Sequence, residues 1–376
     1  MVSCGTLTSA SALRQPLERL YREFDYGARL GRDAIQFPLR YADAHDREVV
    51  SLLTCCLAYG RVDLFGRELD RLLRVMGRSP ASFVREFDPA RHGGAFEGFL
   101  YRFNRPRDIV AFCVAARDVL ARHGTLEKCF LAGDPEPRGP IGPPLERFAR
   151  AFLEADLRDV YPRGRVSRGY RHLFPLPSAG GPCKRLLLYM RWMVRREAPD
   201  FGLWAEVSPA RLLAPVDTHV ENMSRAIGLT RRRSRNWKMA EEITARLATV
   251  DPADPVKYDF ALCHKRMSGD CLDRRDATIC APCGLRAICR HWRGRGTAAV
   301  DRSAASPSAV GHLRETVVAP PDRRATAASG VAPSKSLPAR RDAPQPNARR
   351  RTTASAATAV SLRPPTAKAH TALRYK

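Results

Sequence analysis

Four closely spaced cysteines constrain this chain more than any other feature of its sequence. They are Cys271, Cys280, Cys283 and Cys289, with the spacing C-x8-C-x2-C-x5-C. A tight pair with two flanking thiols supplies four ligands to one metal centre, and thiolates select zinc or iron–sulfur clusters over harder metals. Structural zinc sites usually contain two tight pairs, whereas this run has one. Zinc, an alternative ligand set in which Cys263 replaces Cys271, and ordinary buried thiols all remain open at this point.

The length and the cysteine content indicate a protein of a reducing compartment. The chain has 376 residues, enough for one large or two medium domains with a substantial core. The first residues show no secretory signal pattern. The 11 cysteines are therefore expected to bind metal or to stay free thiols rather than to form disulfides. No apolar run approaches the roughly 18 residues of a membrane-spanning helix. We therefore expect a soluble, cytoplasmic protein without membrane contact.

The charge of the chain favours a polyanionic partner. The net charge is +25, and residues 295–376 hold 15 Lys and Arg against 4 Asp and Glu, so the remainder keeps +14. Such an excess favours binding to nucleic acid through phosphate contacts. Residues 295–376 are rich in Ala, Arg, Pro, Ser and Thr, which predicts a disordered basic tail. This tail either touches phosphates non-specifically or is a passive extension.

The hydrophobic pattern predicts an all-α fold. Residues 49–57, 64–76 and 109–120 each repeat apolar side chains at intervals of three and four, which indicates amphipathic helices. Residues 132–170 are rich in Pro and Gly and are expected to form a surface insertion with one short helix at 145–157.

These patterns divide the chain into three parts. We expect a flexible N-terminus at residues 1–14, a helical domain at 15–294 and the basic tail. Within the domain, residues 263–292 form the predicted cysteine loop.

A glycine-rich segment leads directly into an apolar helical stretch. Gly180 and Gly181 permit positive φ and expose backbone N–H groups at a helix N-terminus, where a phosphate can bind. Lys184 follows at once. An amine at a helix N-terminus in a partly apolar pocket is pushed towards its neutral, nucleophilic form. The alternative is a surface lysine that contacts a phosphate as a point charge.

A second candidate site residue, Asp217, follows a proline and begins another helical stretch. It can act as a carboxylate in catalysis or as the N-cap of that helix, and the two roles are compatible. His219 lies two residues further and points in a different direction, which favours a structural role. Trp192 and Trp204 are expected in the core, with base stacking as the alternative.

Together these motifs resemble the helix-hairpin-helix DNA glycosylases of the endonuclease III superfamily, over roughly residues 15–292. The resemblance is closest to a bacterial branch described only as a domain of unknown function. It rests on L-x-x-P-x-D-T-H-V at 212–220, G-x-x-C-K-R at 180–185 and S-G-D-C at 268–271. The chain departs from the usual L-P-G-V-G hairpin, because two extra residues intervene and Pro182 and Cys183 precede the lysine.

The resemblance implies a two-lobed all-α fold with a DNA groove between the lobes. It also implies that Lys184 attacks the sugar C1′ and forms a Schiff base, while Asp217 supports departure of the base. The cysteine loop would hold a 4Fe–4S cluster through the four cysteines named above. Candidate DNA-binding residues are Gly180, Gly181, Arg185, Arg61 and Asn104, the last in a turn similar to the glycine–tyrosine–asparagine turn of these enzymes.

The expected function is therefore base-excision repair by a DNA N-glycosylase with AP-lyase activity. Its partner would be double-stranded DNA with a damaged or abasic nucleotide, bound by a monomer at the nucleoid after extrusion of one nucleotide. An iron–sulfur protein that binds DNA or RNA without catalysis is the main alternative. Removal of bases from RNA is a third hypothesis.

Overall fold

The computed structural model describes residues 7–293, and within this range every regular element is a helix. The all-α prediction is confirmed. A single isolated β-bridge joins Tyr101 to Asn104. No helix in the described part of the chain is both long and apolar enough to cross a membrane. The predicted basic tail at 295–376 lies outside the described residues.

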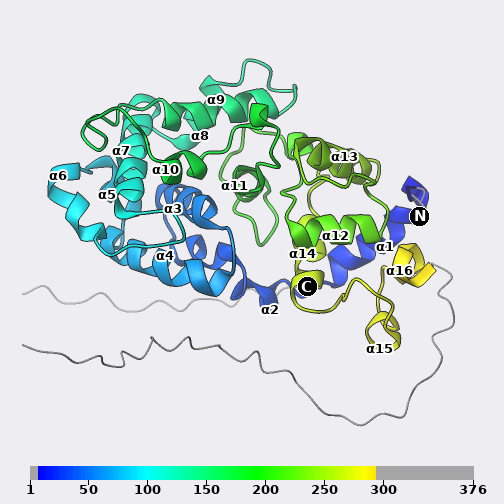
Figure 1. The fold of residues 1–376 in the computed structure, drawn as a ribbon. Coiled ribbons are helices and arrows are strands. Elements are labelled where there is room, and N and C mark those ends of the chain that lie inside the picture. The colour runs from blue at the N-terminus through cyan, green and yellow to red at the C-terminus, as the bar shows by residue number, and fades with distance from the viewer. Residues whose placement is uncertain (1–6, 294–376) are drawn as a thin grey trace, which may run out of the picture. The chain divides into compact units, whose positions relative to one another are not determined.

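The first group of helices surrounds one end of the core (Figure 1). Its members are α3 (Ala44–Leu57), α4 (Val62–Met76), α5 (Pro80–Arg85), α6 (Pro89–His92), α7 (Pro106–His123), α8 (Leu126–Ala132), α9 (Gly142–Leu153) and α10 (Arg168–Leu173), with the 3-10 turns η3 (Gly93–Phe96) and η4 (Pro177–Ala179). The three helices predicted from apolar periodicity correspond to α3, α4 and α7. Asp43 begins α3 by accepting hydrogen bonds from the backbone N–H groups of His45 and Asp46.

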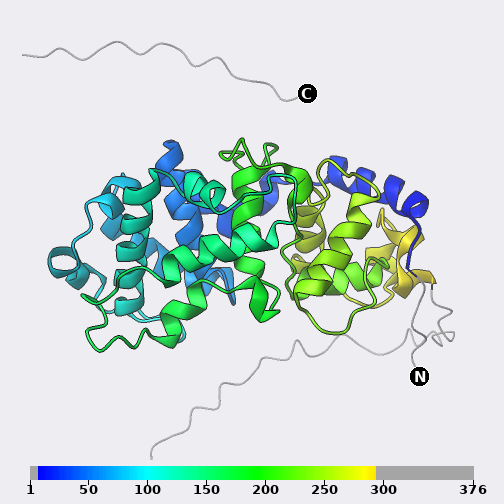
Figure 2. The same ribbon diagram turned by 90° about the horizontal axis from the view of Figure 1, so that it is seen from above.

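The second group joins the start of the described chain to its end (Figures 1 and 2). It comprises α1 (Ala10–Glu23), α12 (Thr218–Ala226), α13 (Trp237–Ala248), α14 (Asp259–Met267), α15 (Ala277–Cys280), α16 (Arg290–Arg293) and η6 (Arg286–Ile288). The backbone N–H of Thr8 donates to the carbonyl of Gly228 at 3.2 Å, and Glu18 pairs with Lys257 at 3.0 Å. The first helix therefore completes the group that the last helices form.

The N-terminal boundary differs from the prediction. Helix α1 begins at Ala10 behind an N-cap at Ser9, and Leu13 and Leu17 are fully buried. The prediction of a flexible segment up to residue 14 is wrong from Ala10 onwards, because these two leucines pack into the core.

The predicted surface insertion is also wrong. Helix α9 contributes Leu145, Phe148 and Phe152 to the core, each at most 1% exposed. The ring of Phe152 stacks on that of Phe174 with centroids 4.6 Å apart. The short helix predicted at 145–157 is present as α9, but its apolar residues, which recur at intervals of three and four, pack into the core and not at the surface.

Helix α11 (Lys184–Val194) lies between the two groups (Figure 1). Its residues from Arg185 to Val194 are all buried. Trp192 and Trp204 are likewise buried, which confirms the core interpretation of both. An ion network fixes the far end of α11, since Arg191 pairs with Asp200 at 3.1 Å and Arg195 pairs with Asp254 at 2.8 Å.

Three connections complete the architecture. Helix α2 (Gly27–Leu30) and the turns η1 (Ala34–Gln36) and η2 (Pro38–Arg40) lead from the second group into the first, and η5 (Pro209–Arg211) precedes α12.

Candidate active site

The N-termini of α11 and α12 meet at one cavity of about 730 Å³. Lys184, the first residue of α11, and Asp217, the N-cap of α12, both line it. The two residues are 33 positions apart in the chain. The structure thus brings together the two side chains that the sequence assigned to catalysis.

Three donors fix the carboxylate of Asp217. Its Oδ1 accepts hydrogen bonds from the backbone N–H groups of His219 at 2.8 Å and Val220 at 2.9 Å. Its Oδ2 accepts from the Cys263 thiol at 3.7 Å. The N-cap interpretation is confirmed. Because capping also locks the side chain, Asp217 is held in one orientation at the cavity.

Lys184 is presented by an uncommon turn. The preceding residue, Cys183, is buried and adopts the left-handed conformation, with φ of 44°, which few residues other than glycine tolerate. In the described part of the chain, no side chain caps α11, and no hydrogen bond or ion pair joins the Lys184 ammonium. The amine and the free N–H groups of the helix therefore face the cavity together.

The glycine loop before Lys184 is tied down on both sides. Gly180 has φ of 74°, and its carbonyl accepts from the backbone N–H of Trp237 at 3.1 Å. Ser178 donates its N–H and its hydroxyl to the Glu146 carboxylate at 2.9 and 2.8 Å. A Cβ added at Gly180 or Gly181 would meet nothing within 4 Å, so the space beside the loop is open. Phosphate binding by this loop stays a prediction.

Two predicted DNA contacts need correction. Asn104 is fully buried, and its amide donates to the carbonyl of Gly169 at 2.9 Å and accepts from the Tyr59 hydroxyl. Arg185 is 7% exposed, donates to the carbonyls of Cys56 and His172, and lies over the ring of Tyr59. Both side chains hold buried backbone carbonyls, and Arg185 also lines the cavity, so neither reaches outward for a phosphate.

The electrostatics of the cavity favour an anion. Arg185 has no carboxylate within ion-pair distance among residues 7–293, and a guanidinium stays charged in proteins. Burial, with smaller contributions from Arg185 and Arg168, lowers the pKa of His172 to about 4, so this imidazole is neutral at physiological pH. Arg235 also lines the cavity. Arg235 is paired with Glu221 at 3.2 Å, so the unpaired positive charge belongs to Arg185 and to Lys184.

Sequence reasoning missed two site residues on α14. Asp259 and Cys263 are one helical turn apart, and both interact electrostatically with Asp217 and Lys184. Burial raises the pKa of Asp259 to about 6; Asp217 adds to the shift, and the charge of Arg191 opposes it. The Oδ1 atom of Asp259 is buried without a hydrogen-bond partner in the described structure. The available signal was their i, i+4 spacing, which puts two side chains on the same face of a helix.

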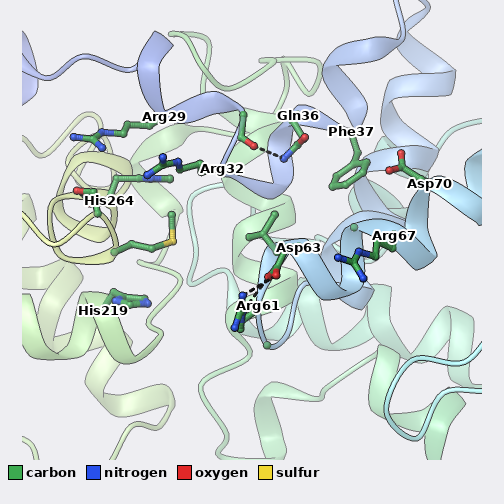
Figure 3. A pocket seen from close by; sticks show the side chains of 16 residues that line it. Arg29, Arg32, Gln36, Phe37, Arg61, Asp63, Arg67, Asp70, His219 and His264 are labelled. Carbon is green, nitrogen blue, oxygen red and sulfur yellow. Dashed lines mark hydrogen bonds and ion pairs between the residues drawn. The ribbon is translucent and has the colours of Figure 1, made fainter. Parts of the chain in front are cut away.

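A second cavity of about 720 Å³ adjoins the first, since Gly60 and His219 line both (Figure 3). Arg29, Arg32 and His264 lie on one side of it, and Arg61 and Arg67 lie on the opposite side.

Arg61 lies apart from Lys184 and Asp217, and His219 has a more central place than the sequence suggested. Arg61, a predicted DNA contact, lines the second cavity only and pairs with Asp63 at 2.8 Å. His219 stands at the junction of the two cavities, and its Nδ1 atom has no hydrogen-bond partner there.

The four predicted metal ligands surround no preformed metal site in the described residues. No group of three or more His, Cys, Asp or Glu side chains is placed to hold a metal ion there. Burial raises the pKa of the Cys289 thiol, and Cys271 and Cys283 add to the shift, so these three thiols lie within electrostatic reach of one another. The donor set suits a cluster, but the described arrangement does not gather all four thiols, including Cys280, at ligating distance.

Cys263 is not part of that loop. It belongs to α14, which extends to Met267, and its thiol contacts Asp217. The predicted cysteine loop therefore starts after this helix, not at residue 263.

Comparison with known proteins supplies a family. A family model described as a protein of unknown function, DUF2400, matches residues 33–268. Comparison with curated proteins and with solved structures found no match. The matched range covers more than half of the chain and includes Lys184, Asp217, Asp259 and Cys263, but it ends before Cys271. The chain therefore belongs to the DUF2400 family.

Proposed function

We propose that this protein is a DNA N-glycosylase with AP-lyase activity, built on a helix-hairpin-helix fold of the endonuclease III type. One observation carries the proposal: a lysine amine without a partner and a locked carboxylate stand at two helix N-termini in one cavity. The cavity falls within the roughly 300–1,000 Å³ typical of ligand sites. The two groups of helices, with α11 between them, are compatible with the two lobes of such an enzyme.

The chemistry uses the two side chains in different roles. The amine of Lys184 forms a bond to C1′ while the bond from C1′ to the base breaks, and its electron pair leaves with the base. Asp217 stabilises the positive charge that develops on the sugar and takes the proton that the amine releases. The proton held by Asp217 passes to O4′ as the ring opens, which leaves a protonated imine between Lys184 and C1′. The Asp217 carboxylate then takes a proton from C2′, and the 3′ phosphate leaves with the electron pair of the C3′–O bond.

The charge of the site supports a nucleic-acid substrate. The uncapped N-terminus of α11, the buried Arg185 and the net charge of +25 all favour a polyanion. We propose double-stranded DNA with a damaged or abasic nucleotide as the partner, bound by a monomer. Extrusion of one nucleotide brings its sugar to Lys184 and Asp217.

The cysteine loop is proposed to hold a 4Fe–4S cluster through Cys271, Cys280, Cys283 and Cys289. The cluster would stabilise the loop, and no reaction step passes through it. Purified protein is expected to contain about four irons per chain and to absorb broadly in the visible range. Stoichiometric zinc without iron would contradict the cluster and leave the glycosylase proposal intact.

Borohydride trapping tests the central claim. Duplexes with oxidised, alkylated, deaminated or abasic nucleotides are incubated with the protein, with and without borohydride. We expect a covalent adduct with at least one substrate. It should be lost in Lys184→Ala and in Lys184→Arg, which keeps the charge but not the nucleophile. The exposed Lys128, on α8 and outside both cavities, provides the control Lys128→Ala.

Asp217 needs a variant that separates capping from catalysis. Asparagine caps helices about as well as aspartate, so Asp217→Asn should fold normally. We expect base release to fall by about 100-fold or more, as for the loss of a general base. An adduct of undiminished yield in Lys184→Ala, or unchanged base release in Asp217→Asn, would refute the assigned roles.

The departures in the hairpin favour a second candidate, an iron–sulfur protein that binds DNA or RNA without catalysis. The residue before Lys184 is Cys183 in the left-handed conformation, which departs from the usual L-P-G-V-G hairpin. This candidate predicts salt-sensitive binding that Asp217→Asn leaves unchanged, and no product on any lesion. The same assay with RNA substrates tests the third hypothesis. Base release from RNA and not from DNA would favour removal of bases from RNA over both candidates.

A further inference from the structure

Helix α14 places a thiol directly against the candidate catalytic carboxylate. The Sγ atom of Cys263 donates to Oδ2 of Asp217 at 3.7 Å, within the normal range for a hydrogen bond that involves sulfur. The other oxygen of Asp217 is already held by two backbone N–H groups of α12. Cys263 therefore supplies the one side-chain contact that fixes the second oxygen in the described structure.

The thiol remains a donor throughout the physiological pH range. Burial raises the pKa of Cys263 well above its ordinary value, and the neighbouring charges of Asp217 and Asp259 raise it further, while Lys184 opposes them. A thiol is a weak donor. Cys263 can therefore orient the carboxylate while neutralising little of its charge. A lysine or arginine partner would neutralise much more of it.

The titratable and charged groups around this contact come from several elements. They are Lys184, Arg185 and Arg191 on α11, His172 on α10, His219 on α12, Asp259 on α14, Arg235 before α13 and Asp33 before η1. Of these, Asp259 has one oxygen bound by Arg191 at 2.5 Å and the other unpaired. Without a donor on Oδ2, Asp217 would face the negative charge of Asp259 with only the two N–H groups of its own helix to hold it.

We infer that Cys263 is a positioning residue for Asp217, which it holds by S–H···O donation so that the carboxylate keeps its place beside Lys184. The catalytic meaning of this inference rests on the proposed function, whereas the contact itself does not. It also explains the fifth cysteine of the C-terminal half without assigning it to a metal.

The first test compares pH profiles of base release. Cys263→Ala removes the donor, Cys263→Ser keeps a hydroxyl donor, and Cys113→Ala removes a buried thiol from α7, away from the cavity, as the control. With a donor to the carboxylate lost, the acidic limb of the Cys263→Ala profile should move upwards by about half to one pH unit. At neutral pH the rate should fall about three- to tenfold. Cys263→Ser should recover part of both, and the control should match the wild type.

The second test needs no activity. The S–H stretching band of Cys263 is isolated as the infrared difference between the wild type and Cys263→Ser. A hydrogen-bonded thiol absorbs at lower frequency than a free one, so Asp217→Ala should move this band upwards, whereas Lys128→Ala should not. An unmoved band overturns the inference whether or not the protein is a glycosylase. A moved band with no base release on any substrate supports the contact and counts against the proposed function alone. Coincident pH profiles for Cys263→Ala and the wild type would reduce Cys263 to a packing residue.

Discussion

Single residues of the site carry more than one task. Asp217 caps α12 and faces Lys184, and both tasks use the same fixed geometry. Asp259 combines a buried ion pair with an unpaired oxygen. Such an arrangement is costly when the carboxylate is ionised, because burial disfavours the charged form. The site therefore carries a pH-dependent stability term that replacement of Asp259 should reveal.

The sign of this term follows from the direction of the shift. Burial raises the pKa of Asp259 from 3.8 to about 6, so the folded protein binds the proton more tightly than the unfolded chain. Its contribution to stability is full below the unfolded value and is lost as pH rises through about 6. The free energy of unfolding of the wild type minus that of Asp259→Asn should fall by up to about 3 kcal/mol over this interval.

Urea denaturation at a series of pH values measures this difference. The exposed Asp156 serves as the control, because hydrogen bonds from Arg158 lower its pKa to about 2, which gives the opposite sign. The difference for Asp156→Asn should not fall with rising pH. A flat difference for Asp259→Asn would show that Arg191 keeps this carboxylate ionised throughout.

At the scale of elements, the glycine loop depends on helix α9. Glu146 accepts two hydrogen bonds from Ser178 and so ties the loop before Lys184 to that helix. Burial raises the pKa of Glu146, but the bonds from Ser178 and Arg150 outweigh it and lower the pKa overall. The carboxylate is therefore available as an acceptor at neutral pH.

Hydrogen exchange should report this tie. In Glu146→Ala, the amides of residues 178–181 and of Cys183 should exchange about tenfold faster or more, because two hydrogen bonds to the loop are lost. Helix content should stay the same. Glu154, the exposed C-cap residue of α9, pairs only with Arg150 at 3.4 Å and supplies the matched control Glu154→Ala. Equal exchange in both variants would mean that the loop is held elsewhere.

What the sequence could predict at this scale was local. Apolar periodicity located α3, α4 and α7, and the proline before Asp217 indicated the start of α12. The burial of α9 was missed because its flanks resemble a loop. The contact between Cys263 and Asp217 was missed because it depends on how α12 packs on α14, which no local pattern encodes. Asn104 and Arg185 were misread because polar residues are usually exposed, whereas here they hold buried carbonyl groups.

At the scale of the whole molecule, positive charge should govern the proposed association with DNA. Arg32 and Arg67 both line the second cavity, and neither guanidinium forms a hydrogen bond or ion pair within the described residues (Figure 3). Each is free to neutralise a phosphate, and each phosphate contact contributes about one unit to the slope of log K against log salt.

The double variant Arg32→Ala/Arg67→Ala tests this role. Its salt slope for duplex binding should be shallower than that of the wild type by about two units. Arg19→Ala, which removes an exposed arginine of α1 paired with Glu23, should keep the slope. A chain that ends at residue 294 retains a net charge of +14 and should still bind in a salt-dependent way. Loss of all binding on truncation would assign association to the tail instead.

The union of α1 with the last helices has a consequence for biosynthesis. A ribosome makes Leu13 and Leu17 first, but Tyr258, whose hydroxyl donates to Glu18 of the same helix, emerges some 240 residues later. Until then the apolar face of α1 lacks its native cover, and the nascent chain must be shielded from aggregation. Premature termination anywhere before α14 would therefore release a polypeptide in which the apolar face of α1 is exposed. Chaperones and proteases recognise such exposed apolar segments.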